Sequence, residues 1–227
     1  MKASITPFIR RICPAPIRLW LPFLWFALTS VHASAAELSV MLKGANGEAL
    51  IDAVVSLVPL DGVARAASAT PRVIAQKNQE FTSYVAVVQT GTRVVFPNQD
   101  KVQHHVYSLS RAKKFELPLY NPGSKESFVF DVPGVVVLGC NIHDWMLAYL
   151  VVVPTPWFAK TDSAGMATVS APVGRYRLDL WHPRLPAGVS QDVTLVSQAD
   201  PRRDFTLTLR ADKRIRRGGG TKSGNYY

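Results

Sequence analysis

Short runs of β-branched and other apolar residues, separated by glycine and proline, recur along most of this chain. No segment has a strong 3.6-residue period of apolar positions, so the pattern does not predict amphipathic helices. Near the end, Phe205, Leu207 and Leu209 alternate with polar residues, as they would in a half-buried strand. Many short strands with tight turns are typical of β-sandwiches and barrels. The sequence therefore predicts an all-β fold.

The predicted strands share a high content of Val, Ile, Leu, Phe and Tyr and are bounded by turn residues such as Asn46-Gly47 and Pro133-Gly134. One of them, Met146–Val153, is apolar throughout, which indicates a strand buried on both faces. The full set is Leu38–Lys43, Ile51–Val58, Thr82–Val88, Thr92–Phe96, His105–Leu109, Ser127–Val132, Val135–Cys140, Met146–Val153, Ala167–Ser170, Arg175–Trp181, Gln191–Val196 and Asp204–Leu209.

The positive charge of the chain is concentrated at its two ends. Of the formal net charge of +10, residues 1–35 carry +4 and residues 210–227 carry +5, which leaves +1 for residues 36–209. A nearly neutral body argues against a nucleic-acid-binding face, and no nucleic acid partner is expected. The basic, glycine-rich residues 211–227 are predicted to be a disordered tail, whose charge would allow contact with an anionic membrane surface.

Residues 1–35 have the features of an export signal. A basic segment precedes the apolar stretch 19–28, which is too short to span a bilayer, and Ala33-Ser34-Ala35 fits an A-x-A cleavage site. We therefore expect a signal peptide over residues 1–35 and a periplasmic protein that begins near Ala36. The alternative is an uncleaved membrane anchor, because the basic segment is long and Pro22 interrupts the apolar stretch.

Cleavage would leave the protein with a single cysteine. Cys13 would depart with the leader and Cys140 would remain, so no internal disulfide is expected. A lone thiol in an oxidising compartment can be a buried, inert residue, a catalytic nucleophile or a metal-bound thiolate. The neighbours of Cys140 decide between these interpretations.

Cys140, His143 and Met146 form the pattern Cys-x-x-His-x-x-Met, and His104 and His105 supply imidazoles upstream. Two histidines, one cysteine and a long axial methionine bond define a blue copper site. A cysteine at a strand end, two loop ligands after it and a histidine from a neighbouring strand would meet at one end of a β-sandwich. Such a site is shaped by the fold, so copper could change oxidation state with little ligand movement.

The run from Val94 to Val106 and the Cys140 loop together resemble the cupredoxins, over about residues 73–153, and the spacing around His143 is similar to amicyanin-type loops. The resemblance implies a Greek-key cupredoxin β-sandwich that holds one type 1 copper ion. Cys140, His143 and Met146 carry over directly as ligands.

The upstream ligand follows from the register of the resemblance. In the cupredoxins this ligand lies in a Pro-His-Asn-Val-like run, which Gln103-His104-His105-Val106 matches here with His104 as the ligand. His105 then stands where the family usually has the asparagine that ties the two ligand loops together. His105 and Asn98 are therefore left as residues that support the ligands or as alternative ligands.

The resemblance implies a periplasmic carrier of single electrons rather than an enzyme. Its partners would be redox proteins: a periplasmic dehydrogenase, a cytochrome or an oxidase. His143, if partly exposed, would be the electron port, and Trp145 beside it could build an apolar docking patch, although packing under the loop explains Trp145 equally simply.

Other interpretations of the same residues remain open. A zinc site is disfavoured by a methionine ligand and a single cysteine, and a Cys140–His143 nucleophile lacks a separate orienting acid unless Asp144 serves. A copper carrier or chaperone without electron transfer would use the same ligands in an exchangeable site. A structural β-sandwich interaction protein would not need them.

The residues outside the copper segment have a pattern of their own. The strand that begins Asp52-Ala53-Val54, the turn Thr161-Asp162-Ser163-Ala164-Gly165 and the strand Pro172–Leu178 resemble the two halves of a carboxypeptidase-regulatory-like, or transthyretin-like, β-sandwich. His182 lies in this module and is assigned no role. The predicted domains are a first part of this second small sandwich at 37–60, a linker at 61–72, the cupredoxin domain at 73–153 and a second part of the small sandwich at 154–210.

Insertion of one domain into another is physically tolerable, because the termini of a domain tend to lie close together. An enlarged single cupredoxin with extra strands is the alternative. The two arrangements differ in whether Leu38–Val58 pairs with strands after Thr161 or with the copper sandwich.

Overall fold

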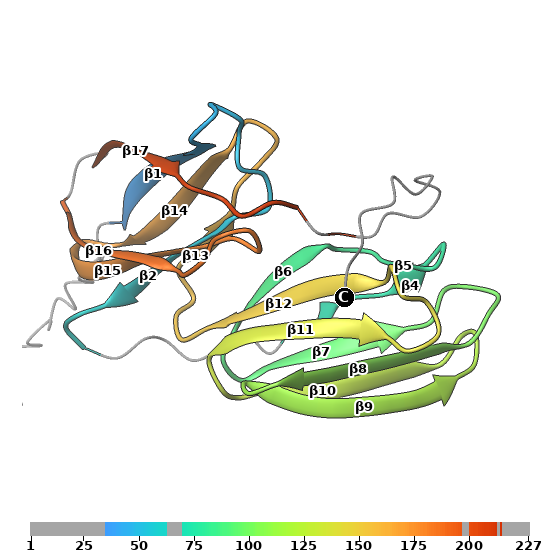
Figure 1. Ribbon diagram of the computed structural model, residues 1–227. Helices are drawn as coiled ribbons and strands as arrows, with labels where there is room; N and C mark the ends of the chain where they lie inside the picture. The colour runs from blue at the N-terminus through green and yellow to red at the C-terminus, as the bar shows by residue number, and fades with distance from the viewer. Residues whose placement is uncertain (1–34, 63–69, 197–199, 213, 215–227) are drawn as a thin grey trace, which may run out of the picture. The chain divides into compact units, whose positions relative to one another are not determined.

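The computed structural model describes residues 35–62, 70–196, 200–212 and 214 (Figure 1). The described residues form β-strands joined by turns and contain no helix, which confirms the predicted all-β class. Residues 1–34 of the predicted signal peptide, most of the linker at 61–72 and most of the tail at 211–227 lie outside the described residues, whereas Ala35, the last residue of the predicted signal peptide, begins strand β1. Within those residues, no helix has the length and apolar character needed to cross a membrane.

One group of strands forms the sandwich that carries the candidate site. Its larger sheet has five strands in the order β6-β12-β11-β8-β9, and its smaller sheet has the order β10-β7-β3. A short hairpin, β4-β5, lies beside them in the chain. The strands are β3 (Arg72–Val73), β4 (Gln76–Lys77), β5 (Glu80–Phe81), β6 (Val85–Gln89), β7 (Thr92–Pro97), β8 (His104–Ser110), β9 (Lys113–Tyr120), β10 (Lys125–Phe130), β11 (Gly134–Cys140) and β12 (Leu147–Val153).

Burial explains why these segments are strands. From His104 to Ser108 in β8 the side chains alternate between buried and half-buried, so one face of the strand enters the core. The strand predicted over Met146–Val153 begins one residue later; it alternates at first and is buried on both faces over its last four residues. The core between the sheets is built from aliphatic residues and from the aromatic rings of Phe96, Phe115 and Phe130, which contact one another.

A second group of strands has its own hydrophobic core. One sheet has the order β14-β1-β17 and the other the order β13-β2-β15-β16. The strands are β1 (Ala35–Gly44), β2 (Val54–Pro59), β13 (Phe158–Lys160), β14 (Met166–Pro172), β15 (Gly174–Trp181), β16 (Val189–Leu195) and β17 (Asp200–Leu207).

The pairing of the first two strands bears on the domain arrangement. β1 pairs antiparallel with β14 and parallel with β17, while β2 pairs with β13 and β15. All four partners follow residue 153 in the chain. The N-terminal strands therefore pair with the C-terminal segment, as an inserted domain requires.

The turn before β14 is set by the two residues that the sequence pattern singled out. The Asp162 carboxylate accepts hydrogen bonds from the backbone N–H groups of Ala164 and Met166, both at 2.9 Å. Gly165 has φ +78°, and a Cβ there would lie 2.5 Å from the backbone oxygen of Leu42. The glycine is required by both the backbone angle and the close approach of β1.

Strand β9 was not predicted, because its sequence KKFELPLY is rich in charge and contains Pro118. It lies at the edge of the five-stranded sheet, where a missing N–H is tolerated. His104 pairs with Tyr120 and Val106 with Leu117, so Pro118 and Leu119 together lie opposite His105. This is a β-bulge, a feature that re-aims side chains near functional sites.

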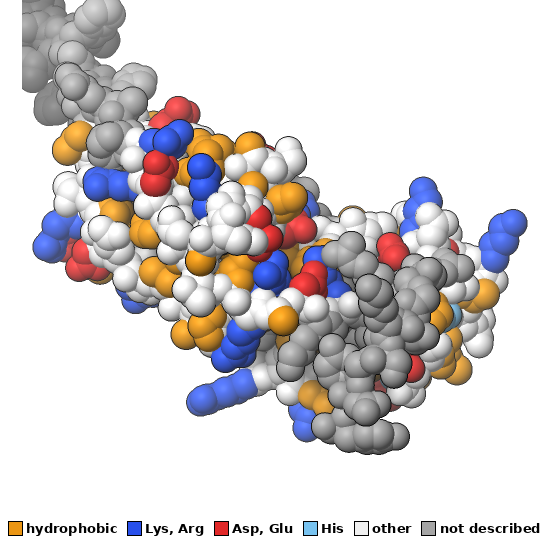
Figure 2. All heavy atoms as spheres, turned by 45° about the horizontal axis from the view of Figure 1, so that its top comes forward, with side chains coloured by type: hydrophobic (Ala, Val, Ile, Leu, Met, Phe, Trp, Pro, Cys, Tyr) orange, Lys and Arg blue, Asp and Glu red, His pale blue; other side chains and the backbone are white. Residues whose placement is uncertain are grey.

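Figure 2 shows lysine, arginine, aspartate and glutamate side chains interspersed over the described part of one face. Ion pairs among the described residues include Arg175–Asp61 at 2.8 Å and Arg184–Glu48 at 3.0 Å. This mixture agrees with the nearly neutral charge of residues 36–209.

Replacing Gly165 with alanine is expected to lower the free energy of unfolding by about 2 kcal/mol or more, because it adds a backbone clash to an unfavourable φ. Gly47→Ala is the matched control: Gly47 has φ +81°, and a Cβ at that position would meet nothing within 4 Å. Gly47→Ala should lower the free energy of unfolding by only about 1 kcal/mol. Urea unfolding measures both, and equal losses would contradict the close approach of β1 to the turn.

Candidate metal centre

Cys140 is the last residue of β11 and points into the sandwich. Its side chain is 4% exposed, and its neighbours Leu138 and Val136 on the same face are fully buried. The loop after it is held by two backbone hydrogen bonds, from His143 N–H to the Cys140 oxygen and from Met146 N–H to the His143 oxygen. The loop therefore folds back toward the sulfur.

His104 is the first residue of β8, which is the antiparallel neighbour of β11. Gly139 pairs with Tyr107 and Cys140 with Val106, so the start of β8 lies beside the end of β11. His104 is fully buried on the same strand face as Val106. Sheet register and strand alternation thus bring an imidazole and a thiol to one end of the sandwich.

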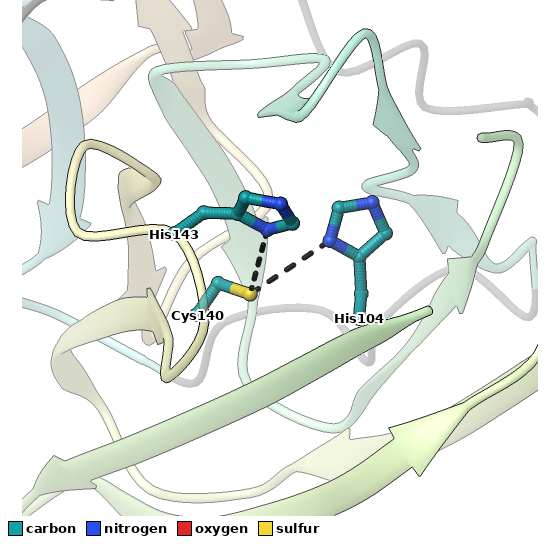
Figure 3. A group of neighbouring side chains, drawn as sticks. All are labelled: His104, Cys140 and His143. Atoms are coloured by element: carbon teal, nitrogen blue, oxygen red, sulfur yellow. Dashed lines mark hydrogen bonds between the residues drawn. The ribbon is translucent and has the colours of Figure 1, made fainter. Parts of the chain in front are cut away.

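The two histidines and the cysteine converge (Figure 3). The Sγ of Cys140 lies 3.7 Å from Nδ1 of His104 and 3.5 Å from Nδ1 of His143. One ligand atom from each of the three residues lies within 4.8 Å of the others. His143 is half-buried, whereas the other two side chains are buried.

These distances fit a metal ion held between the three atoms. Bonds of about 2.0 Å to nitrogen and 2.3 Å to sulfur place those atoms about 3.5 Å apart in tetrahedral geometry and about 3.7 Å apart in trigonal geometry. The two observed sulfur–nitrogen distances match this range. The two sulfur–nitrogen separations therefore fit a first-row metal held between Cys140 and each histidine.

Asp100 holds the other nitrogen of His104. Its Oδ2 lies 2.8 Å from Nε2 of His104, which leaves Nδ1 to face the sulfur. Burial alone would raise the pKa of Asp100, but hydrogen bonds from Gln79, His104 and Asn78 outweigh burial and lower this pKa. The carboxylate is therefore charged beside the candidate ligand.

His105, the alternative ligand, faces away from this cluster. Its Nε2 lies 3.0 Å from Oε1 of Glu116 on strand β9. Because adjacent residues of a strand face opposite sides of the sheet, His105 lies on the other face of β8 from His104, and the structure does not bring it together with Cys140.

Asn98 also lies outside the group of three, where it ties loops together. Its Nδ2 donates to the backbone oxygens of Val102 and Tyr120, and its Oδ1 accepts the N–H of Asp100. These bonds close the loop that precedes His104. Asn98 thus supports the segment that carries Asp100 and His104.

Met146 belongs to the same buried core as Cys140, and its role as an axial ligand remains a prediction. Trp145 packs partly against this core, its ring centroid is 5.3 Å from that of His143, and its Nε1 donates to the oxygen of Gln79 at 2.9 Å. The docking role of Trp145 also remains a prediction.

Two residues near the site were missed by the sequence reasoning. Tyr120, which pairs with His104, donates its hydroxyl hydrogen to Oε1 of Gln76, and its hydroxyl oxygen lies 3.2 Å from the backbone oxygen of Phe96. Burial raises its pKa, and the neighbouring Cys140 raises it further. Asp100 was also missed, although its position four residues before His104 was a usable signal.

His182, to which no role was assigned, is occupied within the second group of strands. Its Nδ1 accepts the backbone N–H of Arg184 at 3.2 Å. Burial, followed by the charge of Arg184, lowers its pKa.

Comparison with known proteins found likenesses in structure. No protein-family model and no curated protein matches the sequence. A copper-containing nitrite reductase from Thermus scotoductus is 24% identical with a TM-score of 0.36, over 41% of this chain and 25% of that one. A purple cupredoxin from Nitrosopumilus maritimus is 24% identical with a TM-score of 0.32, over 36% of this chain and 98% of that one. A Cu(I) structure of an amicyanin mutant is 17% identical with a TM-score of 0.34, over 43% of this chain and 97% of that one.

This chain spans a quarter of the length of the nitrite reductase. Because the identities and TM-scores are low, the chemistry of the site is interpreted from this chain's own residues.

Substitution of the two adjacent histidines should separate their roles. His104→Ala should abolish a thiolate-to-copper absorption band, because it removes the imidazole that faces Cys140. His105→Ala should keep the band and at most shift it. Visible spectra of both copper-loaded variants make the comparison, with circular dichroism as the check on folding; the reverse pattern would show that His105 is the ligand.

Proposed function

We propose that this chain is a type 1 copper protein that carries single electrons, with His104, Cys140 and His143 as the ligands close to copper. The observation that supports this most strongly is the convergence of one sulfur and two imidazole nitrogens at metal-binding separations. They come from two neighbouring strands and one loop, so the arrangement follows from the fold.

The donor set favours copper over zinc. One thiolate and two imidazoles in a plane, with a weak methionine bond, are the ligands of electron-transfer copper. Structural zinc sites use four strong ligands, most often with several cysteines. Cys140 is the only cysteine among the described residues, and Met146 on the same loop is the proposed axial ligand.

The burial of the site suits electron transfer. Copper would supply the one-electron redox chemistry, and the chain holds its ligands and excludes water. Cys140 and His104 are buried, while His143 is half-buried. His143 would therefore be the port at which an electron enters or leaves.

The proposed partners are redox proteins such as a dehydrogenase, a cytochrome or an oxidase, in encounters that are small and transient. Val102, just before β8, and Ile142, in the loop after β11, are exposed apolar residues, and Leu119 is exposed on the neighbouring strand β9. With Trp145, they would supply a surface for such contacts. The chain itself would not be an enzyme, and export to the periplasm would follow from the predicted signal peptide.

The proposed organisation is a cupredoxin domain at 73–153 inserted into a second small sandwich. The pairing of β1 with β14 and β17, and of β2 with β13 and β15, supports this proposal. The two separate buried cores also support it.

The experiment is to add Cu(II) to the purified protein and record its visible spectrum. An intense band that disappears on reduction and returns on oxidation is expected from a thiolate bound to copper. Cys140→Ser is the matched control, because it replaces only the sulfur, and it should remain colourless.

A colourless wild-type protein would contradict the proposed function. If that colourless protein still bound Cu(I) and released it to a competing ligand, the proposed function would be replaced by that of a copper carrier or chaperone. Binding of neither copper state would leave a structural β-sandwich protein.

A further inference from the structure

The hairpin β4-β5 has an unusual two-residue turn. Asn78 and Gln79 have φ angles of 57° and 56°, in the left-handed region. Such angles are uncommon for residues other than glycine, although asparagine adopts them more readily than glutamine does. Because neither residue is glycine, the contacts of this turn must hold it in place.

The turn directs its backbone N–H groups at one carboxylate. Asn78 N–H donates to Oδ1 of Asp100, and Gln79 N–H donates to Oδ2 of Asp100 at 2.8 Å. The same Oδ2 lies 2.8 Å from Nε2 of His104. The Asp100 side chain is only 10% exposed, and a charge so poorly hydrated needs such donors.

The opposite side of the turn contacts the other half of the site. The oxygen of Gln79 accepts a hydrogen bond from Nε1 of Trp145 at 2.9 Å. The Trp145 ring in turn lies beside the His143 ring. One short turn, Asn78–Gln79, is thus connected to both candidate histidine ligands, although it precedes both of them in the chain and belongs to a different hairpin.

We infer that Asp100, held by the Asn78–Gln79 turn, is a positioning residue that fixes the His104 ring for copper. The carboxylate keeps the hydrogen of His104 on Nε2, so that Nδ1 offers its lone pair toward the metal. Its negative charge also favours the more highly charged oxidised metal. This inference rests on the proposed function and concerns the same site.

Two consequences follow from this role. Loss of a hydrogen-bond partner behind a metal-bound histidine lowers metal affinity by roughly 10–100-fold. Loss of the negative charge also raises the reduction potential, because it destabilises Cu(II) relative to Cu(I). A purely structural role for Asp100 would change neither quantity in a protein that remains folded.

The test compares Asp100→Asn with Asp131→Asn. Asp131 is a matched control: it lies in the same sandwich, is 66% exposed and pairs with Lys113 at 3.6 Å. Asp100→Asn should lower the Cu(II) affinity, measured against a competing chelator, by roughly 10–100-fold and raise the reduction potential. Asp131→Asn should stay close to wild type in both. Equal behaviour of the two variants would overturn the inference while leaving the proposed function intact.

A second measurement needs no variant. In proton–nitrogen NMR spectra of the Cu(I)-loaded wild type, the Nε2–H of His104 should exchange slowly with solvent and show a strongly hydrogen-bonded proton shift. An Nε2–H that exchanges as fast as the ring N–H of His143 would overturn the role of Asp100, even if Asp100→Asn failed to fold. Failure of the wild type to bind copper would instead contradict the proposed function.

Discussion

The register between strands β8 and β11 is the constraint on which the candidate site depends. Because Cys140 pairs with Val106, the end of one strand lies beside the start of the other. Alternation then turns Cys140 and His104 into the same buried layer. A shift of one residue in either strand would turn its ligand to the outer face of the sheet, and the site would be lost.

The surroundings of the three candidate ligand residues indicate a site that is organised without a metal. A buried imidazole without polar partners would be unfavourable. Here the His104 ring is held by Asp100, whose carboxylate is in turn held by two backbone N–H groups. Because the ligands are held by the sheet and by this carboxylate, a change of metal charge would require little movement of the protein. Small reorganisation is the property that a one-electron carrier needs.

The sequence pattern predicted most of the strands, because burial of one face imposes a period of two on their residues. It also selected Cys140, His143 and His104, because few combinations of residue types have soft-metal chemistry and because the register of the cupredoxin resemblance favours His104 over His105. It missed β9, whose charges and Pro118 are compatible with a strand only at a sheet edge. Edge position is a tertiary property that no local pattern carries.

The support behind the ligands was harder to predict for a related reason. Asn78 and Gln79 lack the glycine that usually marks a turn with positive φ. Their contacts with Asp100 and Trp145 join segments that lie 21 and 66 residues away in the chain. Such contacts are fixed by the assembled sandwich, and no local pattern in the sequence signals the pairing.

The most direct test of the account is X-ray absorption spectroscopy at the copper edge of the copper-loaded protein. The account predicts one short copper–sulfur bond and two copper–imidazole bonds in the oxidised form, with nearly the same distances after reduction. A first shell of oxygen and nitrogen atoms without sulfur, or ligands that rearrange when the metal is reduced, would contradict it.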